Sequence, residues 1–222
     1  MALSINGTTI NRVVVVDDDQ AARSAFDFTL EELGVQPVRQ EQDLTGSPND
    51  VLPLLRGKAD ALVSDYHLRK KGTYAHFEGD ALVAAANAAH FPALLCTSYA
   101  DALLTVRRNL RRHIPTLLTA EDYNPHSFKQ GIKLCVEESK GIFDPTRKPW
   151  RSLVRVEDIE RERGYFYVVV VGWGAEQKIP IALDEVPEGI RAQLKAGYRL
   201  HAKVNRGALR AEDLFFDEWE GK

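Results

Sequence analysis

The stretch RVVVVDDD at residues 12–19 decides the fold class of this chain. A continuous run of β-branched apolar residues is typical of a strand that is buried on both faces, because it leaves no polar side for solvent. Asp17, Asp18 and Asp19 end this run and place carboxylates at the end of the strand. Strands of this kind occur in sheets that carry helices on both faces.

The segments that follow alternate between strand-like and helix-like patterns up to about residue 140. We expect strands at residues 12–16, 35–39, 60–64, 92–96 and 114–118, and helices at residues 20–34, 49–57, 79–89, 100–112 and 125–140. Strict alternation predicts a parallel sheet, since parallel neighbours are usually joined through a crossover helix. The predicted fold class of this part is therefore α/β, with a doubly wound five-stranded parallel sheet.

Polar side chains end three of the predicted strands. Asp17 and Asp18 end the first strand, Asp65 the third and Thr97 the fourth. Ligands of such sheets bind outside the carboxyl ends of the strands. Converging carboxylates repel one another unless a hard cation lies between them, and oxygen ligands suit Mg²⁺. A carboxylate beside Mg²⁺ can act as a nucleophile toward phosphorus, and a neighbouring hydroxyl can hold a phosphoryl oxygen.

The pattern changes after residues 144–150, which form a proline-containing linker. Strands are predicted at residues 165–171 (YFYVVVV), 178–183, 198–204 and 214–216, with one short helix within 187–196. Alternation along YFYVVVV places Phe166, Val168 and Val170 on one face and Tyr165, Tyr167, Val169 and Val171 on the other. We therefore expect a domain at 1–143, the linker at 144–150, and a small, mostly-β domain with an SH3/OB-like barrel at 151–222.

Composition and charge exclude several broad classes of protein. The 222-residue chain has a net charge of −3, with 44% hydrophobic and 27% charged residues. This is ordinary globular composition, and it disfavours a protein held to nucleic acid by bulk positive charge. Cys96 and Cys135 lie in separate apolar runs and fit no metal spacing, so we expect buried, reduced thiols. No membrane span or secretion signal is visible, and we expect a cytoplasmic protein with no membrane partner.

Four stretches together resemble the receiver domain of two-component response regulators: VVVVDDD, ALVSDYHL, GDALVAAANA and PALLCTSYAD. Their order and spacing carry the resemblance, which covers residues 12 to about 136. It implies a flavodoxin-like sheet with strand order 2-1-3-4-5. It also implies roles for site residues: Asp65 as the phosphoacceptor, Asp18 as a Mg²⁺ ligand with Asp17 beside it, the main-chain carbonyl of His67 as a further ligand, and Thr97 as a contact to the phosphoryl group.

The sequence departs from the family pattern around this site. The lysine of the Lys-Pro pair that usually follows the fifth strand aligns with Glu121 in one register and with Asn124-Pro125 in another. A glutamate there would repel a phosphoryl group, because two like charges about 4 Å apart repel by roughly 4 kcal/mol at an effective dielectric constant of 20. Arg69 stands where a proline is usual, in a longer loop that also carries Lys70 and Lys71. These cations are either solvated loop charges or a replacement for the lysine.

Two functions of the receiver-like domain stay open at this point. In one, Asp65 accepts a phosphoryl group in a Mg²⁺-dependent reaction; in the other, a pseudo-receiver keeps the fold as a constitutive docking surface. Either way the protein is a signalling or adaptor protein rather than an enzyme, with output through protein contacts of the C-terminal domain. The resemblance implies a histidine kinase or a kinase-like ATPase as partner. The basic helix face at Arg107–Arg112 is either solvated or a surface for a protein partner or a homodimer.

Two further hypotheses are weaker. A nucleic-acid-binding effector would use a stacking groove on an OB-like barrel. Its candidate residues are Tyr165, Phe166, Tyr167, Trp173, Lys178, Arg199, Lys203 and Arg206. These aromatics equally suit a small core, and residues 151–222 hold 12 basic and 13 acidic residues, which does not favour nucleic acid. The spacing of Asp17 and Asp19 also occurs in haloacid-dehalogenase-like (HAD-like) phosphatases, but Ala21 stands where these usually have threonine.

Overall fold

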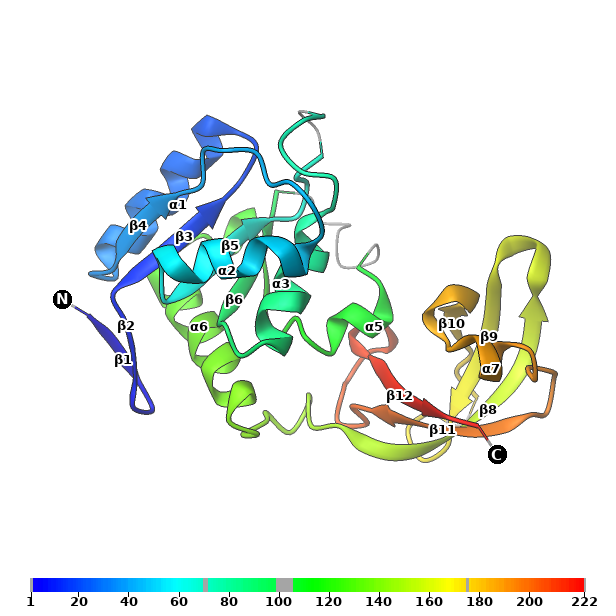
Figure 1. The fold of residues 1–222 in the computed structure, drawn as a ribbon. Helices are drawn as coiled ribbons and strands as arrows, with labels where there is room; N and C mark the ends of the chain where they lie inside the picture. Colours follow the sequence, from blue (N-terminus) through cyan, green and yellow to red (C-terminus); the bar gives the residue numbers. More distant parts are fainter. Residues whose placement is uncertain (1, 70–71, 99–105, 175, 222) are drawn as a thin grey trace. The chain divides into compact units, whose positions relative to one another are not determined.

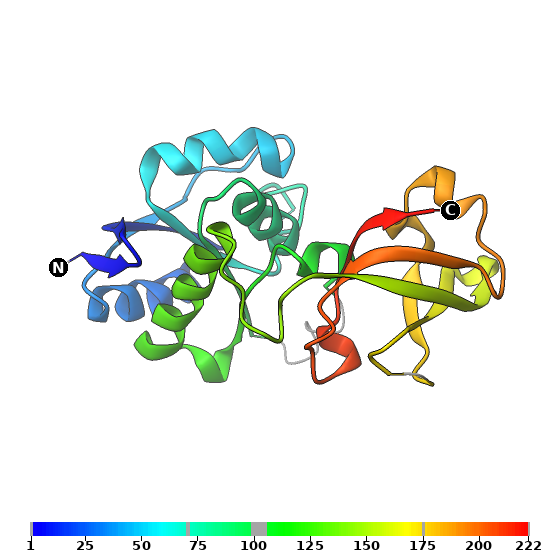
Figure 2. The same cartoon turned by 90° about the horizontal axis from the view of Figure 1, so that it is seen from below.

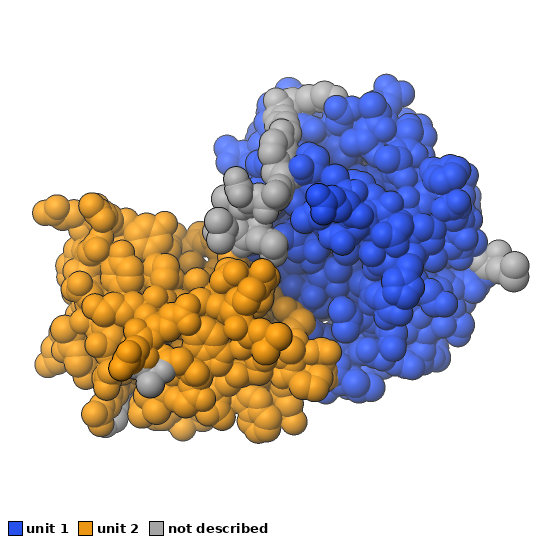
Figure 3. Space-filling view, turned by 180° about the vertical axis from the view of Figure 1, so that it is seen from behind, with its two compact units in different colours: residues 1–106, 113–142 blue, residues 107–112, 143–222 orange. Residues whose placement is uncertain are grey.

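The computed structural model describes residues 2–69, 72–98, 106–174 and 176–221 (Figure 1). The chain divides into two compact units (Figure 3). The N-terminal unit comprises residues 1–106 and 113–142, and the C-terminal unit comprises residues 107–112 and 143–222. The short segment 107–112 therefore belongs to the C-terminal unit although both of its neighbours in sequence belong to the other. None of the helices in the described ranges has the length and apolarity that a membrane span needs.

The N-terminal unit is built on a five-stranded parallel sheet, as the sequence predicts. Its strands are β3 (Arg12–Val16), β4 (Gln36–Arg39), β5 (Ala61–Asp65), β6 (Ala93–Thr97) and β7 (Leu117–Thr119). They are arranged as β4-β3-β5-β6-β7, which is the order 2-1-3-4-5 when the five strands are counted along the chain. This is the flavodoxin-like arrangement that the receiver resemblance implies.

Helices cover both faces of this sheet. They are α1 (Gln20–Glu32), α2 (Pro48–Lys58), α3 (Gly79–Ala88) and α6 (Pro125–Ser139). Helices α1 and α6 pack together on one face, and α2 and α3 pack on the other (Figure 2). The side chains of Val13–Val16 are fully buried, because the strand between the two layers has no face open to solvent.

Two parts of the N-terminal unit differ from the sequence prediction. The strand expected at 114–118 is β7, which begins three residues later, at Leu117. Of the helix expected at 100–112, only α5 (Arg108–Arg111) is seen, since residues 99–105 lie outside the described part. The helix α5 belongs to segment 107–112, which is part of the C-terminal unit.

An N-terminal β-hairpin extends the core of this unit. It consists of β1 (Leu3–Ile5) and β2 (Thr8–Ile10), joined by Asn6 and Gly7. Both turn residues have positive φ angles, 46° and 79°, as a two-residue type I′ turn requires. Lys140 at the end of α6 donates from Nζ to the carbonyl of Asn6, at 2.5 Å. Leu3, Ile5 and Ile10 of the hairpin belong to the hydrophobic core of the unit.

The C-terminal unit contains a curled, five-stranded antiparallel sheet (Figure 2). Its strands are β8 (Trp150–Glu160), β9 (Tyr165–Val170), β10 (Ile179–Ala182), β11 (Arg199–Val204) and β12 (Phe216–Glu220), in the order β10-β9-β8-β11-β12, with the short helix α7 (Glu188–Arg191) before β11. Edge strands β10 and β12 are not paired with each other among the described residues, so the barrel is partly open. Phe166, Val168 and Val170 point into the core, as the predicted alternation requires.

Candidate functional site

The sheet brings the predicted site residues to one edge. Strands β3, β5 and β6 are neighbours, and their register aligns Val16 with Ser64 and Asp65 with Cys96. Asp17 and Asp18 follow β3 directly, whereas Asp65 and Thr97 are the last residues of β5 and β6. The parallel order of these strands places all four side chains at their common carboxyl edge. The carboxylates and the hydroxyl thus lie in the same region.

Two of these carboxylates are buried, which is unusual for charged groups. Asp17 is 2% exposed and Asp18 is 6% exposed, while Asp65 is half-buried. Burial raises the pKa of Asp17 to about 7. The main-chain N–H of Asp19 donates to Asp17 Oδ1 at 2.7 Å and opposes this shift, and the carboxylates of Asp65, Asp18 and Asp19 add to it. Each charged side chain that shifts the pKa of Asp17 is therefore another carboxylate.

The carboxylates of the site also raise the pKa values of two groups in the interior behind it. Burial raises the pKa of the Cys96 thiol, and Asp65 and Asp17 raise it further. Tyr123, which packs against Phe26 with the ring centroids 5.1 Å apart, also has a pKa raised first by burial and then by Cys96, Asp65 and Asp17. Tyr123 was not predicted as part of the site, although it lies between Asp122 and Asn124 just before α6. Nearby negative charges favour the neutral form of this phenol.

Local hydrogen bonds fix the orientation of Asp65. The main-chain N–H of His67 donates to Asp65 Oδ2 at 2.9 Å, and Ser64 Oγ donates to the Asp65 carbonyl at 2.9 Å. His67, whose carbonyl is the predicted metal ligand, therefore also binds Asp65, the predicted phosphoacceptor, through its main-chain N–H. One bond thus holds an oxygen of the carboxylate, and the other holds the main chain beside it.

Gly79, the first residue of α3, is a positioning residue that sequence reasoning missed. A β-carbon at this position would lie 1.8 Å from the Asp65 carbonyl oxygen and 2.8 Å from Ser64 Oγ. The N–H of Gly79 donates to the Tyr66 carbonyl at 2.7 Å. Helix α3 can therefore begin directly against the end of β5 only because position 79 has no side chain. The signal was present in the sequence, as a Gly-Asp pair at a predicted helix start.

The donor set fits a hard divalent cation. It consists of carboxylate oxygens and the main-chain carbonyl of His67, which are the oxygen ligands that Mg²⁺ prefers. In the described ranges, no three carboxylate, imidazole or thiol side chains are clustered closely enough to hold a metal by themselves. A cation here would therefore be completed by the carbonyl and by water, as Mg²⁺ sites usually are.

Asp19 has a different task from its two neighbours. It is the N-cap of α1, and its Oδ1 accepts from the main-chain N–H of Ala21 at 2.8 Å. Such a cap satisfies a donor at the helix start that would otherwise lack a partner. The carboxylate that the phosphatase pattern would need as its second aspartate is therefore used to start a helix, which weighs against that hypothesis.

The region after β7 favours one of the two proposed registers for the missing lysine. Asn124 is the N-cap of α6, accepting from Ser127 N at 3.0 Å, and Pro125 is the first helical residue. Glu121 instead lies two residues after β7 and is exposed. Glu121 is thus nearer to the end of the fifth strand than Asn124 is, and the chain has a carboxylate there instead of a cation.

The loop after β5 is anchored by a tyrosine rather than simply solvated. Tyr74 is buried, and its hydroxyl donates to the Gln40 carbonyl at 2.8 Å. The N–H of Leu44 donates to the Tyr74 carbonyl at 2.6 Å. Arg69 is exposed, and Lys70 and Lys71, the other candidates to replace the lysine, lie outside the described residues. The aromatic anchor was not predicted, because nothing local distinguishes Tyr74 from a surface tyrosine.

Comparison with known proteins gave matches among solved structures alone. No family model and no curated protein sequence matches the chain. A response regulator receiver domain from Clostridium thermocellum is 15% identical, with a TM-score of 0.42, and the match covers 60% of this chain and 99% of that one. An uncharacterized protein from Neptuniibacter caesariensis is 20% identical, with a TM-score of 0.43 and coverage of 60% and 94%. A receiver domain protein from Methanospirillum hungatei is 17% identical, with a TM-score of 0.41 and coverage of 60% and 98%.

The strand order and the placement of the acidic residues describe the N-terminal unit independently of these matches. The order β4-β3-β5-β6-β7, the carboxylates after β3 and at the end of β5, and the hydroxyl at the end of β6 are the features by which the sequence resembles receivers. The N-terminal unit has the fold of a response regulator receiver domain.

Proposed function

We propose that the N-terminal unit is a Mg²⁺-dependent phosphoacceptor module with Asp65 as the residue that is phosphorylated. The observation that carries this proposal is the placement of Asp17, Asp18 and Asp65 at one sheet edge, where burial raises the pKa of Asp17 and the neighbouring carboxylates raise it further. Neighbouring carboxylates repel one another, and a bound divalent cation would offset this repulsion. Asp18 and the His67 carbonyl would hold this cation together with Asp65, and Asp17 would lie beside it.

Each residue of the edge has a role in the proposed transfer. An oxygen of Asp65 forms a bond to phosphorus, while the bond from phosphorus to the donor's nitrogen or oxygen breaks and its electron pair stays on the donor. Bound Mg²⁺ would neutralise part of the incoming phosphoryl charge. Thr97 lies at the end of the neighbouring strand, from which its hydroxyl would donate to a phosphoryl oxygen. The donor class that fits is a phosphohistidine of a histidine kinase or of a kinase-like ATPase.

The absence of the usual lysine should affect how the domain responds to phosphorylation more than the phosphoryl transfer itself. Glu121 is exposed, so water and salt screen its repulsion of a phosphoryl group well below the value for a buried pair. Phosphorylation would therefore proceed, but the connection that a lysine normally makes between phosphoryl group and fifth strand would be missing. The signal must then leave the site by another route, of which Thr97 and the chain that follows β6 are the candidates.

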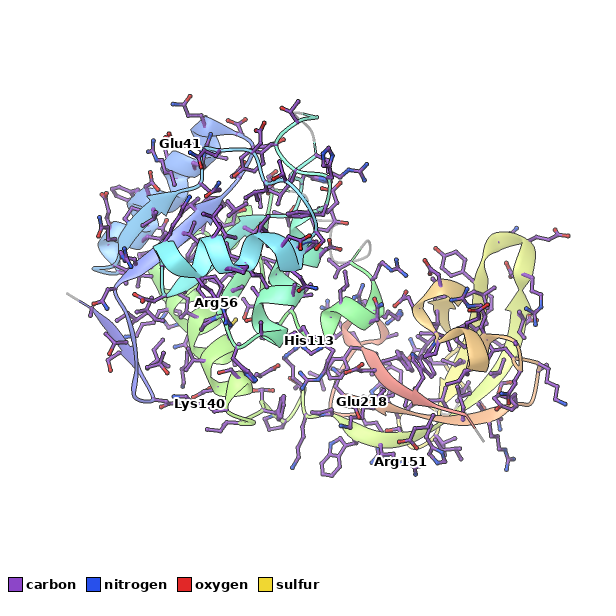
Figure 4. All side chains as sticks on the ribbon, viewed as in Figure 1. Glu41, Arg56, His113, Lys140, Arg151 and Glu218 are labelled. Atoms are coloured by element: carbon purple, nitrogen blue, oxygen red, sulfur yellow. The ribbon has the colours of Figure 1, made fainter. Side chains whose placement is uncertain are left out.

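The C-terminal unit supports protein contacts better than nucleic-acid binding. Lys203 and Glu218 form an ion pair at 2.7 Å, as do Arg151 and Glu220, and Figure 4 shows Arg151 and Glu218 on this sheet. Trp173 donates from Nε1 to the Ala208 carbonyl at 2.7 Å and packs against the core, which removes it from a stacking platform. Lys203, one of the four cations that the nucleic-acid hypothesis names, is therefore paired with a carboxylate within the sheet.

Incubation with acetyl phosphate and Mg²⁺, read by intact-protein mass, tests the proposal. We expect a gain of one phosphoryl group per chain that disappears with EDTA and in Asp65→Asn, but not in Glu32→Gln, which changes an exposed carboxylate on α1. A mass gain that persists in Asp65→Asn would place the modification elsewhere. If no gain appears under any condition, the domain is instead a pseudo-receiver that serves as a docking surface.

A further inference from the structure

The segment Arg107–Arg112 is packed into the C-terminal unit by its own polar contacts. This unit is coloured orange in Figure 3 and includes the segment although β6 and β7, on either side of it in sequence, belong to the N-terminal sheet. The chain therefore passes into the C-terminal unit between two neighbouring receiver strands, returns, and enters it again after residue 142.

Arg108 is the centre of this anchoring. Its Nε donates to the Pro180 carbonyl at 3.0 Å, and its Nη1 donates to the carbonyls of Ala211 and Leu214, at 2.7 and 3.1 Å. Burial, together with the neighbouring Arg111, lowers the pKa of Arg108 to about 10. A buried guanidinium that serves three main-chain carbonyls depends on the backbone geometry of the whole acceptor site, because those carbonyls come from different parts of the unit.

Further contacts hold both ends of the segment. The main-chain N–H of Asn109 donates to Glu185 Oε2 at 2.8 Å. Arg147 donates from Nη2 to the carbonyls of Arg111 and Arg112, each at 3.2 Å, and so satisfies acceptors at the end of α5. The guanidinium of Arg112 also lies 5.6 Å from the ring centre of Phe215, which is fully buried. Unlike the solvated arginine face or external docking surface expected from the sequence, the segment is an integrated part of the C-terminal unit.

We infer that Arg107–Arg112 is an internal anchor through which the state of the receiver site reaches the C-terminal unit, and that this unit is the partner for which the basic segment is built. The inference rests on the proposed function for its trigger. Thr97 is the last residue of β6, and the anchor lies between β6 and β7 in the sequence, with contacts of its own to the C-terminal unit. A shift at the end of β6 or at the start of β7 would therefore act on an element that has contacts in the C-terminal unit.

Such coupling is reciprocal, which makes it measurable from either side. If occupation of the receiver site changes the strength of the anchor, loss of the anchor must change the affinity of the receiver site by the same factor. The variant Arg108→Ala removes the three carbonyl contacts, and Arg108→Lys keeps the charge but cannot serve all three. Arg107→Ala is the matched control, since Arg107 makes an ion pair with Asp184 at 2.9 Å between exposed side chains.

The test uses hydrogen exchange of the full-length chain, with and without Mg²⁺ and beryllofluoride, and Mg²⁺ affinity measured by calorimetry. We expect loading to change the exchange rate of peptides covering 107–112 by about tenfold, in the wild type and in Arg107→Ala. We expect Arg108→Ala to abolish this dependence and to change Mg²⁺ affinity by about fivefold or more. Tryptophan fluorescence checks that the unit stays folded, and Arg108→Lys replaces Arg108→Ala if it does not.

The outcomes separate this inference from the proposed function. If Mg²⁺ and beryllofluoride bind but neither exchange at 107–112 nor the affinity of the Arg108 variants changes, the anchor is only structural and the inference is wrong, while the proposed function stands. If beryllofluoride does not load, the comparison of Mg²⁺ affinities between Arg108→Ala and Arg107→Ala decides. If Mg²⁺ does not bind at all, the trigger is absent and both proposals fail.

Discussion

Substitution of Gly79 by alanine should damage both the fold and the acidic site. The added β-carbon would lie 1.8 Å from the Asp65 carbonyl oxygen, whereas non-bonded heavy atoms of this kind rest at roughly 3.5 Å. The obstacle is main chain and cannot rotate away, so either α3 or the end of β5 must shift. Overpacking of a buried position of this kind lowers the free energy of unfolding by about 1–3 kcal/mol.

The chain offers a matched control for this substitution. Gly57 lies near the end of α2, and a β-carbon there meets no atom within 4 Å. Gly57→Ala should therefore raise the free energy of unfolding by about 0.5–1 kcal/mol, through the better helix propensity of alanine. The two substitutions have the same chemistry and opposite expected signs, so their comparison isolates the contact with Asp65.

Urea unfolding, followed by tryptophan fluorescence and by circular dichroism, shows which of the two structural units the substitution destabilises. Trp150, Trp173 and Trp219 all belong to the C-terminal unit, so tryptophan fluorescence reports on that unit. The helical circular dichroism signal reports chiefly on the N-terminal unit, which contains α1, α2, α3 and α6. We expect Gly79→Ala to move the helical transition alone and to weaken Mg²⁺ binding, because the main chain of Asp65 is displaced. Unchanged unfolding and unchanged Mg²⁺ affinity would refute this account of the α3 start.

Two further predictions concern the loop anchor and the thiols. Tyr74→Phe removes the hydrogen bond to the Gln40 carbonyl and should lower the free energy of unfolding of the N-terminal unit by about 0.5–1.5 kcal/mol, measured by urea titration; an equally stable variant would show that the loop is not anchored there. Cys96 and Cys135 are buried, and burial raises the pKa of Cys96, so a thiol reagent at neutral pH should label the folded protein only as fast as it unfolds; immediate labelling of two thiols would contradict this.

The parts of the fold that follow from local pattern could be predicted from sequence. Val13–Val16 are all apolar and all buried, and the chain alternates in the way a parallel sheet requires. The placement of Asp18 and Asp65 at one edge of the sheet could be predicted from sequence, because the carboxyl ends of parallel strands share one edge. The asparagine–glycine turn of the N-terminal hairpin was also available as a signal, since Asn6 and Gly7 form a favoured turn pair.

The parts that depend on contacts distant in sequence could not be predicted. The carbonyls that bind Arg108 lie 72, 103 and 106 residues further along the chain, and no periodicity in residues 100–112 encodes them. Tyr74 is likewise fixed by a main-chain carbonyl 34 residues before it. The sequence pattern identified the basic segment as notable but assigned it to a surface helix, because a pattern of charges does not reveal which charges are buried.

Calorimetric titration of Mg²⁺ tests most directly whether the carboxylates of the sheet edge hold one cation. We expect the wild-type chain to bind one Mg²⁺, and both Asp18→Asn and Asp65→Asn to lose affinity by about tenfold or more, because each removes a charged oxygen ligand. Glu32→Gln, which alters an exposed carboxylate of α1, should bind as the wild type does. Wild-type affinity in Asp18→Asn and Asp65→Asn would contradict the account, since the edge of β3 and β5 would then not be the cation site.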